Sequence, residues 1–395
     1  MIGFDEALRL LLAQARPLGS EDVPLAAAAG RVLAEPVRAA IRSPARDVST
    51  MDGYAVREMG LAALPARLAV AGQSLPGQAQ GAAPGPGQCV RIFTGAPLPA
   101  GTDRVVVQEE VRRDGEWAVI AGPPEPARYI RRAGSDFERD DVLVEAGTLL
   151  GPRSLVAAAA ADVAQLSVWR RPRIRMIATG DELVEPGRAR DRVGAIPDSI
   201  SCGLAALAGE WGGVSCGRTM LCDDLPGLEA AAAEAAAGVE LVVVTGGASV
   251  GERDFARRMF EPLGLQLFFS KVAIKPGKPV WFGQAGKTLV LGLPGNPTSA
   301  LVTARLFLAP LLAAMCGRDP AEALAWRQGA LGEAIGATGD RETFSRAMLA
   351  GGAIKLLPNQ DSGSQASLVR AELLVRRPIG AAALEAGAAV EVLDF

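Results

Sequence analysis

"RIRMIATGDE", residues 173–182, decides the fold, because a short apolar run ends directly in a loop of one glycine and two carboxylates. The residues that follow, up to 317, continue this pattern with short apolar runs separated by alanine-rich amphipathic stretches. Such alternation is typical of a doubly wound parallel sheet with helices on both faces. We therefore expect one α/β domain over residues 172–317.

The elements of this α/β domain follow from the same periodicity. Strands are expected at 173–179, 214–220, 239–245, 265–274 and 287–294, and helices at 201–211, 225–237, 254–264 and 298–315.

Three further regions surround the α/β domain, which makes the chain a multidomain α/β protein. Residues 44–133 are rich in Val, Gly and Pro with short alternating runs, which predicts a β-rich domain. A helix beginning near Pro152 and an amphipathic N-terminal helix predict a discontinuous helical linker domain over 1–43 and 134–171. The last segment, 318–395, is expected to form a small β-barrel-like domain.

Composition excludes several classes of protein. With 49% hydrophobic and 22% charged residues and a net charge of −3, the chain is not suited to nucleic acid as its main partner. The N-terminal helix begins with acidic residues, unlike a signal peptide, and the apolar run 301–315 is interrupted by Arg305 and Pro310, which argues against a membrane span. We expect a cytoplasmic protein, with its five cysteines, none in a C-x-x-C pair, packed in cores.

The absence of histidine is the most useful exclusion. No imidazole base, histidine metal ligand or Ser-His-Asp triad can exist within one chain. Residues 247–251, "GASVG", match the nucleophile elbow of hydrolases, yet only a disfavoured Ser249–Lys pair could replace the triad. "GKT" at 286–288 lacks the earlier glycine of a phosphate-binding loop and is interpreted as a turn between two strands.

Ligands of an open α/β sheet bind beyond the carboxyl ends of its strands. Those ends carry "GDE" after the first strand, "CDD" after the second, "GGASVGERD" after the third and "PGNP" after the last. The fourth leads into "KVAIKPGKP", residues 271–279, which holds three of the chain's five lysines. Carboxylates, glycines and lysines are therefore expected to meet at one edge.

This edge is predicted to be an anion site with a divalent cation. Glycines 246, 247 and 251 would let backbone N–H groups approach an oxyanion. Lysine supplies a compact, strongly hydrated charge on a flexible stem, which the rigid fork of arginine does not. Carboxylates after the strands suit Mg²⁺ with several waters retained. These metal ligands would be Glu182, Asp223 and Asp254.

Six motifs carry a resemblance to a known family. They are "STMDGYAV" (49–56), "IFTGAPLP" (92–99), "TGDEL" (179–183), "TGGASVGERDF" (245–255), "KVAIKPGKP" (271–279) and "GLPGNPTSA" (292–300). Together they resemble the signatures of the molybdopterin molybdenumtransferase family, which is related to gephyrin. The resemblance runs from the N-terminal helix to the last β-segment.

The resemblance implies an elongated homodimer of four-part subunits, whose α/β domain is similar to molybdopterin adenylyltransferase. It implies a site between the α/β domain of one subunit and the β-rich domain of the other. The implied reaction converts adenylylated molybdopterin and molybdate, with Mg²⁺, to molybdopterin-bound molybdenum and AMP. It also suggests molybdopterin adenylyltransferase and molybdoenzymes as protein partners.

The resemblance assigns roles by motif. The catalytic set would be Glu182, Asp223, Asp254, Lys271, Lys275 and Asp52. The substrate-binding set would be Thr94, Asp136, Gly180, Asp198, Gly246, Gly247, Ser249, Gly251, Lys278, Pro294, Asn296, Pro297 and Ser362. Without the resemblance, Asp52 would be interpreted as a turn former before Gly53, and Thr94 as a β-residue before a turn.

One departure and three rival functions remain open. Ile200 stands in "IPDSIS" (196–201) where the family has an amide, so that Asp198 alone keeps the polar role. The rivals are an ATP-using adenylyltransferase, a tungsten-specific paralogue and a non-catalytic scaffold like gephyrin. The motif "STMDGYAV" and the long flanking domains argue against the first, and the acidic and lysine residues argue against the last.

Overall fold

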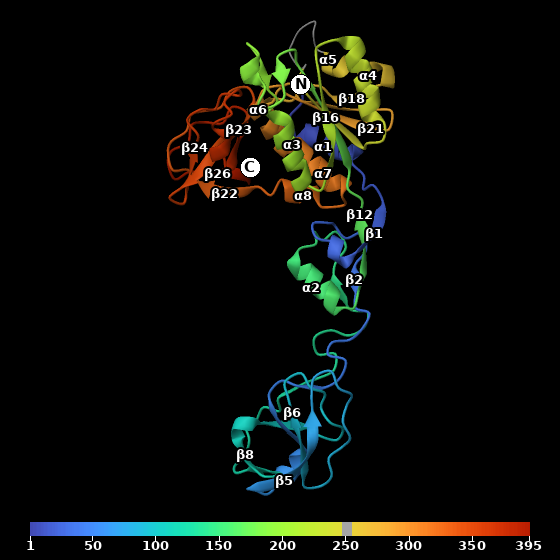
Figure 1. Ribbon diagram of the computed structural model, residues 1–395. Coiled ribbons are helices and arrows are strands. Elements are labelled where there is room, and N and C mark those ends of the chain that lie inside the picture. The colour runs from blue at the N-terminus through green and yellow to red at the C-terminus, as the bar shows by residue number, and fades with distance from the viewer. Residues whose placement is uncertain (247–254) are drawn as a thin grey trace.

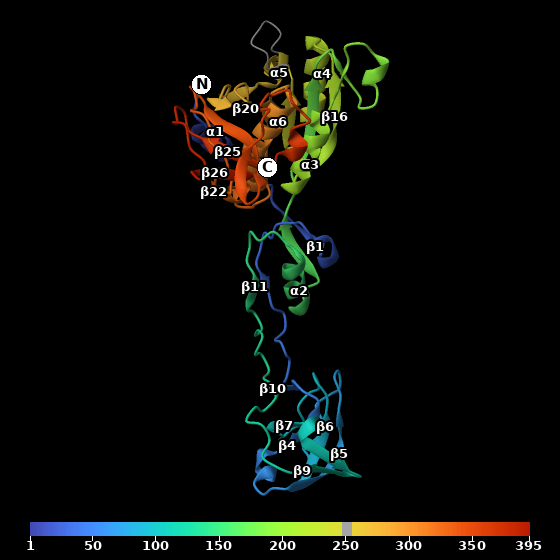
Figure 2. The same ribbon diagram turned by 90° about the vertical axis from the view of Figure 1, so that its left-hand side faces the viewer.

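The computed structural model describes residues 1–246 and 255–395 and shows an elongated molecule with two lobes (Figure 1). One lobe contains the α/β domain with the C-terminal sheet beside it, and the other is the β-rich domain. A smaller part with helix α2 (Pro152–Ala160) lies between them. Figure 2 shows the same separation from a second direction.

The α/β domain is built on a six-stranded sheet with the order β16-β13-β17-β21-β20-β18. The first four strands in that order are parallel, which confirms the expected parallel sheet, and β20 is antiparallel to both β21 and β18. The strands are β13 (Arg173–Thr179), β16 (Val214–Leu221), β17 (Leu241–Thr245), β18 (Gln266–Phe269), β20 (Trp281–Ala285) and β21 (Thr288–Leu293).

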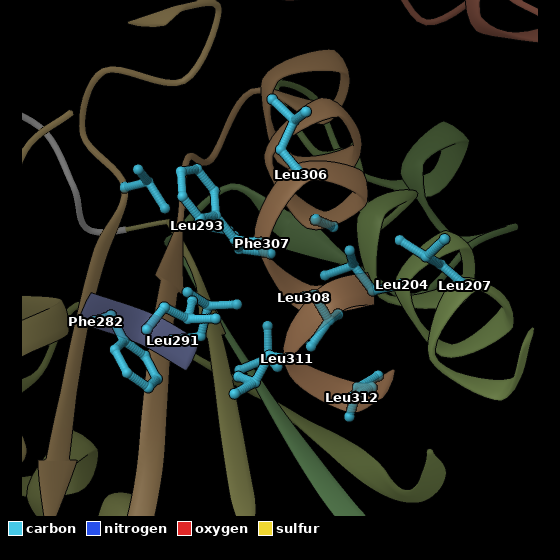
Figure 3. Close-up of a cluster of buried hydrophobic side chains, with 14 of the residues drawn as sticks. Leu204, Leu207, Phe282, Leu291, Leu293, Leu306, Phe307, Leu308, Leu311 and Leu312 are labelled. Carbon is cyan, nitrogen blue, oxygen red and sulfur yellow. The ribbon is translucent and has the colours of Figure 1, made fainter. Parts of the chain in front are cut away.

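Helices cover both faces of this sheet. One face packs against α3 (Ile200–Glu210) and a long buried helix formed by α6 (Pro297–Thr303), the π-helical turn η6 (Ala304–Leu308) and α7 (Ala309–Met315). Figure 3 shows this core, where Phe282, Leu291 and Leu293 of the sheet face the leucines of the two helices. The opposite face packs against α4 (Leu225–Ala236) and α5 (Phe255–Arg258).

The segment expected to be one strand at 265–274 forms two strands in different sheets. β18 ends at Phe269, and the chain then crosses to the C-terminal sheet, where β19 (Ile274–Lys275) pairs with β23. Val272 and Ile274 are fully buried, with Ala273 also buried between them. Three consecutive buried residues show that the crossing lies inside the protein. The sequence pattern, an uninterrupted apolar run, does not distinguish such a crossing from one continuous buried strand.

The C-terminal sheet follows the order β19-β23-β25-β26-β22, with β24 paired to β23. It has its own apolar cluster, but Phe344, Leu374 and Leu393 also belong to the core of the α/β domain. Its strands are β22 (Arg327–Ala330), β23 (Glu342–Ala350), β24 (Ala353–Leu356), β25 (Leu373–Arg377) and β26 (Ala389–Asp394).

The N-terminal helix α1 (Phe4–Gln14) forms as expected, but its predicted packing with the linker domain is wrong. The Phe4 ring lies 5.4 Å from the ring of Phe307 and 5.1 Å from that of Phe344. Its other buried positions, Ala7 and Leu11, belong to the same core of the α/β domain. The apolar stripe of α1 therefore fills the space between the long buried helix and the C-terminal sheet.

The chain passes through the middle part twice, once on its way to the β-rich domain and once on its way back. In the middle part, β1 (Ser20–Pro24) pairs with β12 (Gln165–Trp169) and β2 (Val37–Arg38) with β11 (Val142–Val144). The β-rich domain has the order β7-β4-β6-β5-β9-β8, and the four-part division as a whole stays a prediction. Its strands are β4 (Gly53–Val56), β5 (Ala66–Ser74), β6 (Gln88–Ile92), β7 (Arg104–Val107), β8 (Val111–Asp114) and β9 (Trp117–Ile120), with β3 (Val48–Ser49) paired to β10 (Ile130–Arg131).

The continuous helix over Pro297–Met315 is long and apolar enough to cross a membrane by length and composition. However, 89% of its most apolar 18-residue window is buried within the protein. This burial accounts for the apolar character of the helix without a membrane. Arg305 and Pro310 do not interrupt the helix, contrary to expectation; Arg305 is accommodated by donating to the carbonyls of Ala323 and Asp394. The cytoplasmic location stays a prediction.

Replacing Phe4 by alanine is expected to destabilise the lobe that contains the α/β domain by about 3–5 kcal/mol, because the cavity opens between two aromatic rings. Urea unfolding followed by tryptophan fluorescence measures the change. Val156→Ala is the matched control, since Val156 is 70% exposed and its truncation leaves no cavity. Equal midpoints for the two variants would contradict this account of α1.

Candidate functional site

The carboxylates of the predicted edge lie after the neighbouring strands β13 and β16. The backbone N–H of Asp223 donates to Asp181 Oδ1 over 3.0 Å, which joins the two loops. Glu182 is exposed, and both of its carboxylate oxygens lie 3.0 Å from where a Cβ on Gly180 would stand. Gly180 thus leaves the space over which the Glu182 carboxylate folds back.

The middle of the edge is a close approach of two glycine loops. Gly246 has a φ of +90°, and a Cβ there would lie 2.3 Å from the carbonyl oxygen of Thr179. A Cβ on Gly295 would lie 3.2 Å from the Cα of Gly246. Side chains are therefore excluded where the loops after β17 and β21 meet. Gly247, Ser249, Gly251 and Asp254 lie outside the described residues.

The "PGNP" loop connects the edge to the C-terminal domain. Asn296 Nδ2 donates to Ser362 Oγ over 3.0 Å, and the backbone N–H of Thr298 donates to the Ser362 carbonyl over 3.2 Å. Pro294 is buried, and Pro297 is the first residue of α6. The structure thus brings Asn296 and Ser362 together from segments far apart in the sequence.

The lysines lie at the other end of the same edge. Lys271 follows β18 and Lys278 precedes β20, and both side chains are exposed. Strands β20 and β18 are three and four positions from β13, so the lysines and the Glu182 loop are separated by roughly 14–19 Å at ordinary strand spacing. The structure does not bring these lysines and carboxylates together; they occupy opposite ends of one edge.

Lys275 lies instead on the C-terminal sheet, where it lines a cavity of about 270 Å³. Its strand pairs with β23 so that Lys275 stands beside Thr343. Arg341 and Arg377 line the same cavity, and Asp340 is the carboxylate among the lining residues. Three cations against one carboxylate make the cavity attractive to anions. Its volume is just below the roughly 300 Å³ of drug-sized pockets, which leaves room for a small anion together with water.

Asp52 and Thr94 form a second constellation in the β-rich domain. Asp52 Oδ1 accepts from the backbone N–H of Thr94 over 2.8 Å and from its hydroxyl over 2.9 Å. Arg91 stacks 5.1 Å from the Tyr54 ring and donates to the Gly53 carbonyl over 3.0 Å. Asp52 directly precedes β4, and Thr94 lies just after β6. Both strands lie in the lobe opposite the α/β sheet (Figure 2). One subunit does not bring them to the edge.

Two further predicted residues have local contacts. Asp136 lies between β10 and β11, on the connection to the β-rich domain, where its backbone N–H donates to the Ser43 carbonyl. Asp198 is only 2% exposed; it accepts from the backbone N–H of Ser201 at the start of α3 and pairs with Arg218 over 2.5 Å. The structure thus gives Asp198 a role within the fold, and its substrate contact stays a prediction.

Sequence reasoning missed the two arginines that join Lys275 around the cavity. No motif contains Arg341 or Arg377, because the register of β23 against β19 and β25 decides their position. A cation directly before or at the end of a C-terminal strand is the weak signal that could have found them.

The donor set after β13 and β16 fits a hydrated divalent ion. The carboxylates of Glu182 and Asp223, on the two joined loops, are the kind of hard oxygen ligand that Mg²⁺ prefers. The other coordination positions would be left to water or substrate. Among the residues that the structure describes, no group of three or more carboxylates or thiols is close enough to hold a metal. Asp254, the third predicted ligand, lies outside those residues.

Comparison with known proteins covers almost the whole chain. Residues 2–161 match the "MoeA N-terminal region (domain I and II)", 175–314 the "Probable molybdopterin binding domain" and 328–395 the "MoeA C-terminal region (domain IV)". The molybdopterin molybdenumtransferase of Synechococcus elongatus is 34% identical over 99% of both chains. That of Haemophilus influenzae is 37% identical over 80% of this chain and 78% of its own.

Solved structures agree with these relatives. The molybdopterin biosynthesis MoeA protein of Pyrococcus horikosii superposes with a TM-score of 0.86 at 31% identity, over 99% of this chain and 98% of its own. The fold is thus that of a multidomain protein with a molybdopterin-binding type of α/β domain. The chain belongs to the molybdopterin molybdenumtransferase family, the transferases of molybdenum cofactor biosynthesis.

Hydrogen bonds from Thr94 hold the pKa of the Asp52 carboxyl below its ordinary value of 3.8. A carboxyl whose pKa is lowered by folding stabilises the folded protein at pH values above its pKa in the unfolded chain. This stabilisation is lost as the pH falls through the pKa of the folded protein. A carboxyl-carbon NMR titration should therefore find Asp52 below 3.8, and Thr94→Val should raise its pKa towards 3.8. Because valine keeps the backbone N–H, an unchanged pKa in this variant would contradict the role of the Thr94 hydroxyl.

Proposed function

We propose that this protein inserts molybdenum from molybdate into adenylylated molybdopterin and releases AMP. The observation that carries the proposal is the cavity lined by Lys275, Arg341 and Arg377, in a chain of this family. A cationic cavity of this size suits a small dianion such as molybdate. The long edge of the sheet beside it suits an extended pterin nucleotide.

The residues of the sheet edge and of the cavity divide the work by charge. Lys271 and Lys275 neutralise oxyanion oxygens of molybdate and phosphate, with Lys278 beside them. Asn296 and Ser362 offer an amide and a hydroxyl at the middle of the edge, where Gly246 and Gly295 keep the loops free of side chains. The chemistry needs no covalent protein nucleophile, in agreement with a chain that has no histidine.

Glu182 and Asp223 would hold Mg²⁺ at the other end of the edge, with Asp254 as the third predicted ligand. When bound, the ion would polarise the phosphoanhydride that joins AMP to molybdopterin. The hydrogen bond between the Asp223 N–H and Asp181 keeps the two loops, and so the two carboxylates, at a fixed spacing. This pairing of loops supports the assignment.

We further propose that the site is completed by a second copy of the chain. Asp52 and Thr94 lie in the lobe opposite the edge, so that they reach an edge only in another subunit. A two-fold dimer places the same surfaces in contact twice and forms two equal sites.

Lys275→Ala is expected to lower molybdenum insertion at least about 100-fold, because the site loses a charge that stabilises the oxyanion. The assay combines the purified protein, adenylylated molybdopterin, Mg²⁺ and either molybdate or tungstate, and measures AMP release and metal uptake. Comparing the two oxyanions also tests the tungsten-specific alternative.

Lys287→Ala is the matched control for Lys275, since Lys287 lies in the turn between β20 and β21, at the opposite edge of the sheet. It should insert molybdenum at the wild-type rate. If Lys275→Ala did so as well, the assignment of the cavity as the molybdate site would be wrong.

Mixing two inactive variants tests the shared site. An Asp52→Asn subunit and a Lys275→Ala subunit, denatured and refolded together, should recover about a quarter of wild-type activity, because half of the dimers are mixed and each has one intact site. Each variant refolded alone measures the background. Recovery no greater than that background would show that a site does not draw residues from two subunits.

A further inference from the structure

Arg346 lies on β23 and is one of the largest fully buried side chains, with 1% of its surface exposed. Its guanidinium donates to neutral oxygens. Nη1 donates to Ser367 Oγ over 2.7 Å, and Nη2 donates to the carbonyls of Asn359 and Asp361 over 3.0 and 3.1 Å. A buried cation is costly unless all its donors are used, so its retention here calls for a reason.

The three acceptors lie on one loop, residues 359–367, which we call the serine loop. Its turns are closed locally: Asp361 N–H donates to Asn359 Oδ1 and Gly363 N–H to Asp361 Oδ1. Gln360 adds backbone bonds to Arg346, as its Oε1 accepts from the Arg346 N–H and its Nε2 donates to the Arg346 carbonyl. The serine loop is thus fixed to β23 through both the side chain and the backbone of Arg346.

The same guanidinium reaches the α/β domain. Arg346 Nη1 lies 3.4 Å from Thr298 Oγ1 and 3.4 Å from the Ser364 carbonyl, and Thr298 Oγ1 itself donates to that carbonyl over 2.9 Å. Thr298 is fully buried in the first turn of α6, two residues after Asn296. The two domains therefore meet in a buried polar cluster behind Ser362 and Asn296.

We propose that Arg346 is a positioning residue for the substrate site. Through the serine loop and Thr298, it holds Ser362 against Asn296 at the middle of the sheet edge. The inference rests on the proposed function, because it assumes that this edge binds the pterin nucleotide. A planar fork with five donors can serve several acceptors of one loop, whereas an ammonium group cannot span them.

Thr298 gives the sharpest test, because Arg346→Met leaves several buried carbonyls without a donor and risks failure to fold. Thr298→Val keeps the shape and removes the hydroxyl, and Thr298→Ser restores the hydroxyl. We expect Thr298→Val to raise the KM for adenylylated molybdopterin about tenfold with kcat little changed, and Thr298→Ser to stay near wild type. Lys355→Met, an exposed change on the neighbouring strand β24, is the control.

Two further measurements separate positioning from general stability. Amide hydrogen exchange in the serine loop should quicken in Thr298→Val and in Arg346→Met if it folds, while exchange in β25 stays slow. The double variant Thr298→Val with Ser362→Ala should have the KM of Ser362→Ala alone, since both changes act on one contact.

The results distinguish this inference from the proposed function. If Ser362→Ala raises KM but Thr298→Val leaves KM and loop exchange unchanged, the positioning role is overturned while the proposed function stands. Additive effects in the double variant overturn it as well. If Ser362→Ala has the wild-type KM, the assignment of Ser362 to the site fails, and the positioning inference fails with it.

Discussion

The burial of the helix over residues 297–315 is the constraint on which the rest of the structure depends. One side of it covers the α/β sheet, and another receives α1 and the C-terminal sheet. It begins at the sheet edge beside Asn296. At its other end, a Cβ on Gly317 would lie 2.3 Å from the Trp169 ring of the middle part, which shows how tightly the two are packed. A single apolar element thus relates three regions of the chain to the site.

The edge that results separates opposite charges instead of pairing them. Among the residues that the structure describes, carboxylates follow β13 and β16 and lysines border β18 and β20, with Gly246, Gly295 and Asn296 between them. Had Glu182 and Lys271 been in contact, each would have neutralised the other, and neither would be available to a metal ion or an oxyanion. Their separation by intervening strands keeps both charges open to an extended ligand.

Much of this could be predicted from the sequence, because the apolar runs of β13, β17 and β21 and the loops after them are local patterns. The family resemblance also identified Ser362 as a site residue. Its contact with Asn296 could not be predicted from any local pattern, because the two residues are far apart in the sequence. The crossing after Phe269, the partner of α1 and the cavity around Lys275 depend on how the C-terminal sheet packs and on its register. The ion pair between Asp198 and Arg218 likewise connects the loop between β13 and α3 to the edge strand β16. Such long-range pairings leave no periodic signal in one sequence.

The position of Phe4 has a consequence for biosynthesis. Helix α1 leaves the ribosome well before Phe307 and Phe344, whose rings cover its Phe4. Synthesis at roughly 5–20 residues per second therefore leaves its apolar stripe uncovered for tens of seconds, while the middle part and the β-rich domain fold first. We expect that during this interval the exposed apolar stripe makes the nascent chain prone to aggregation.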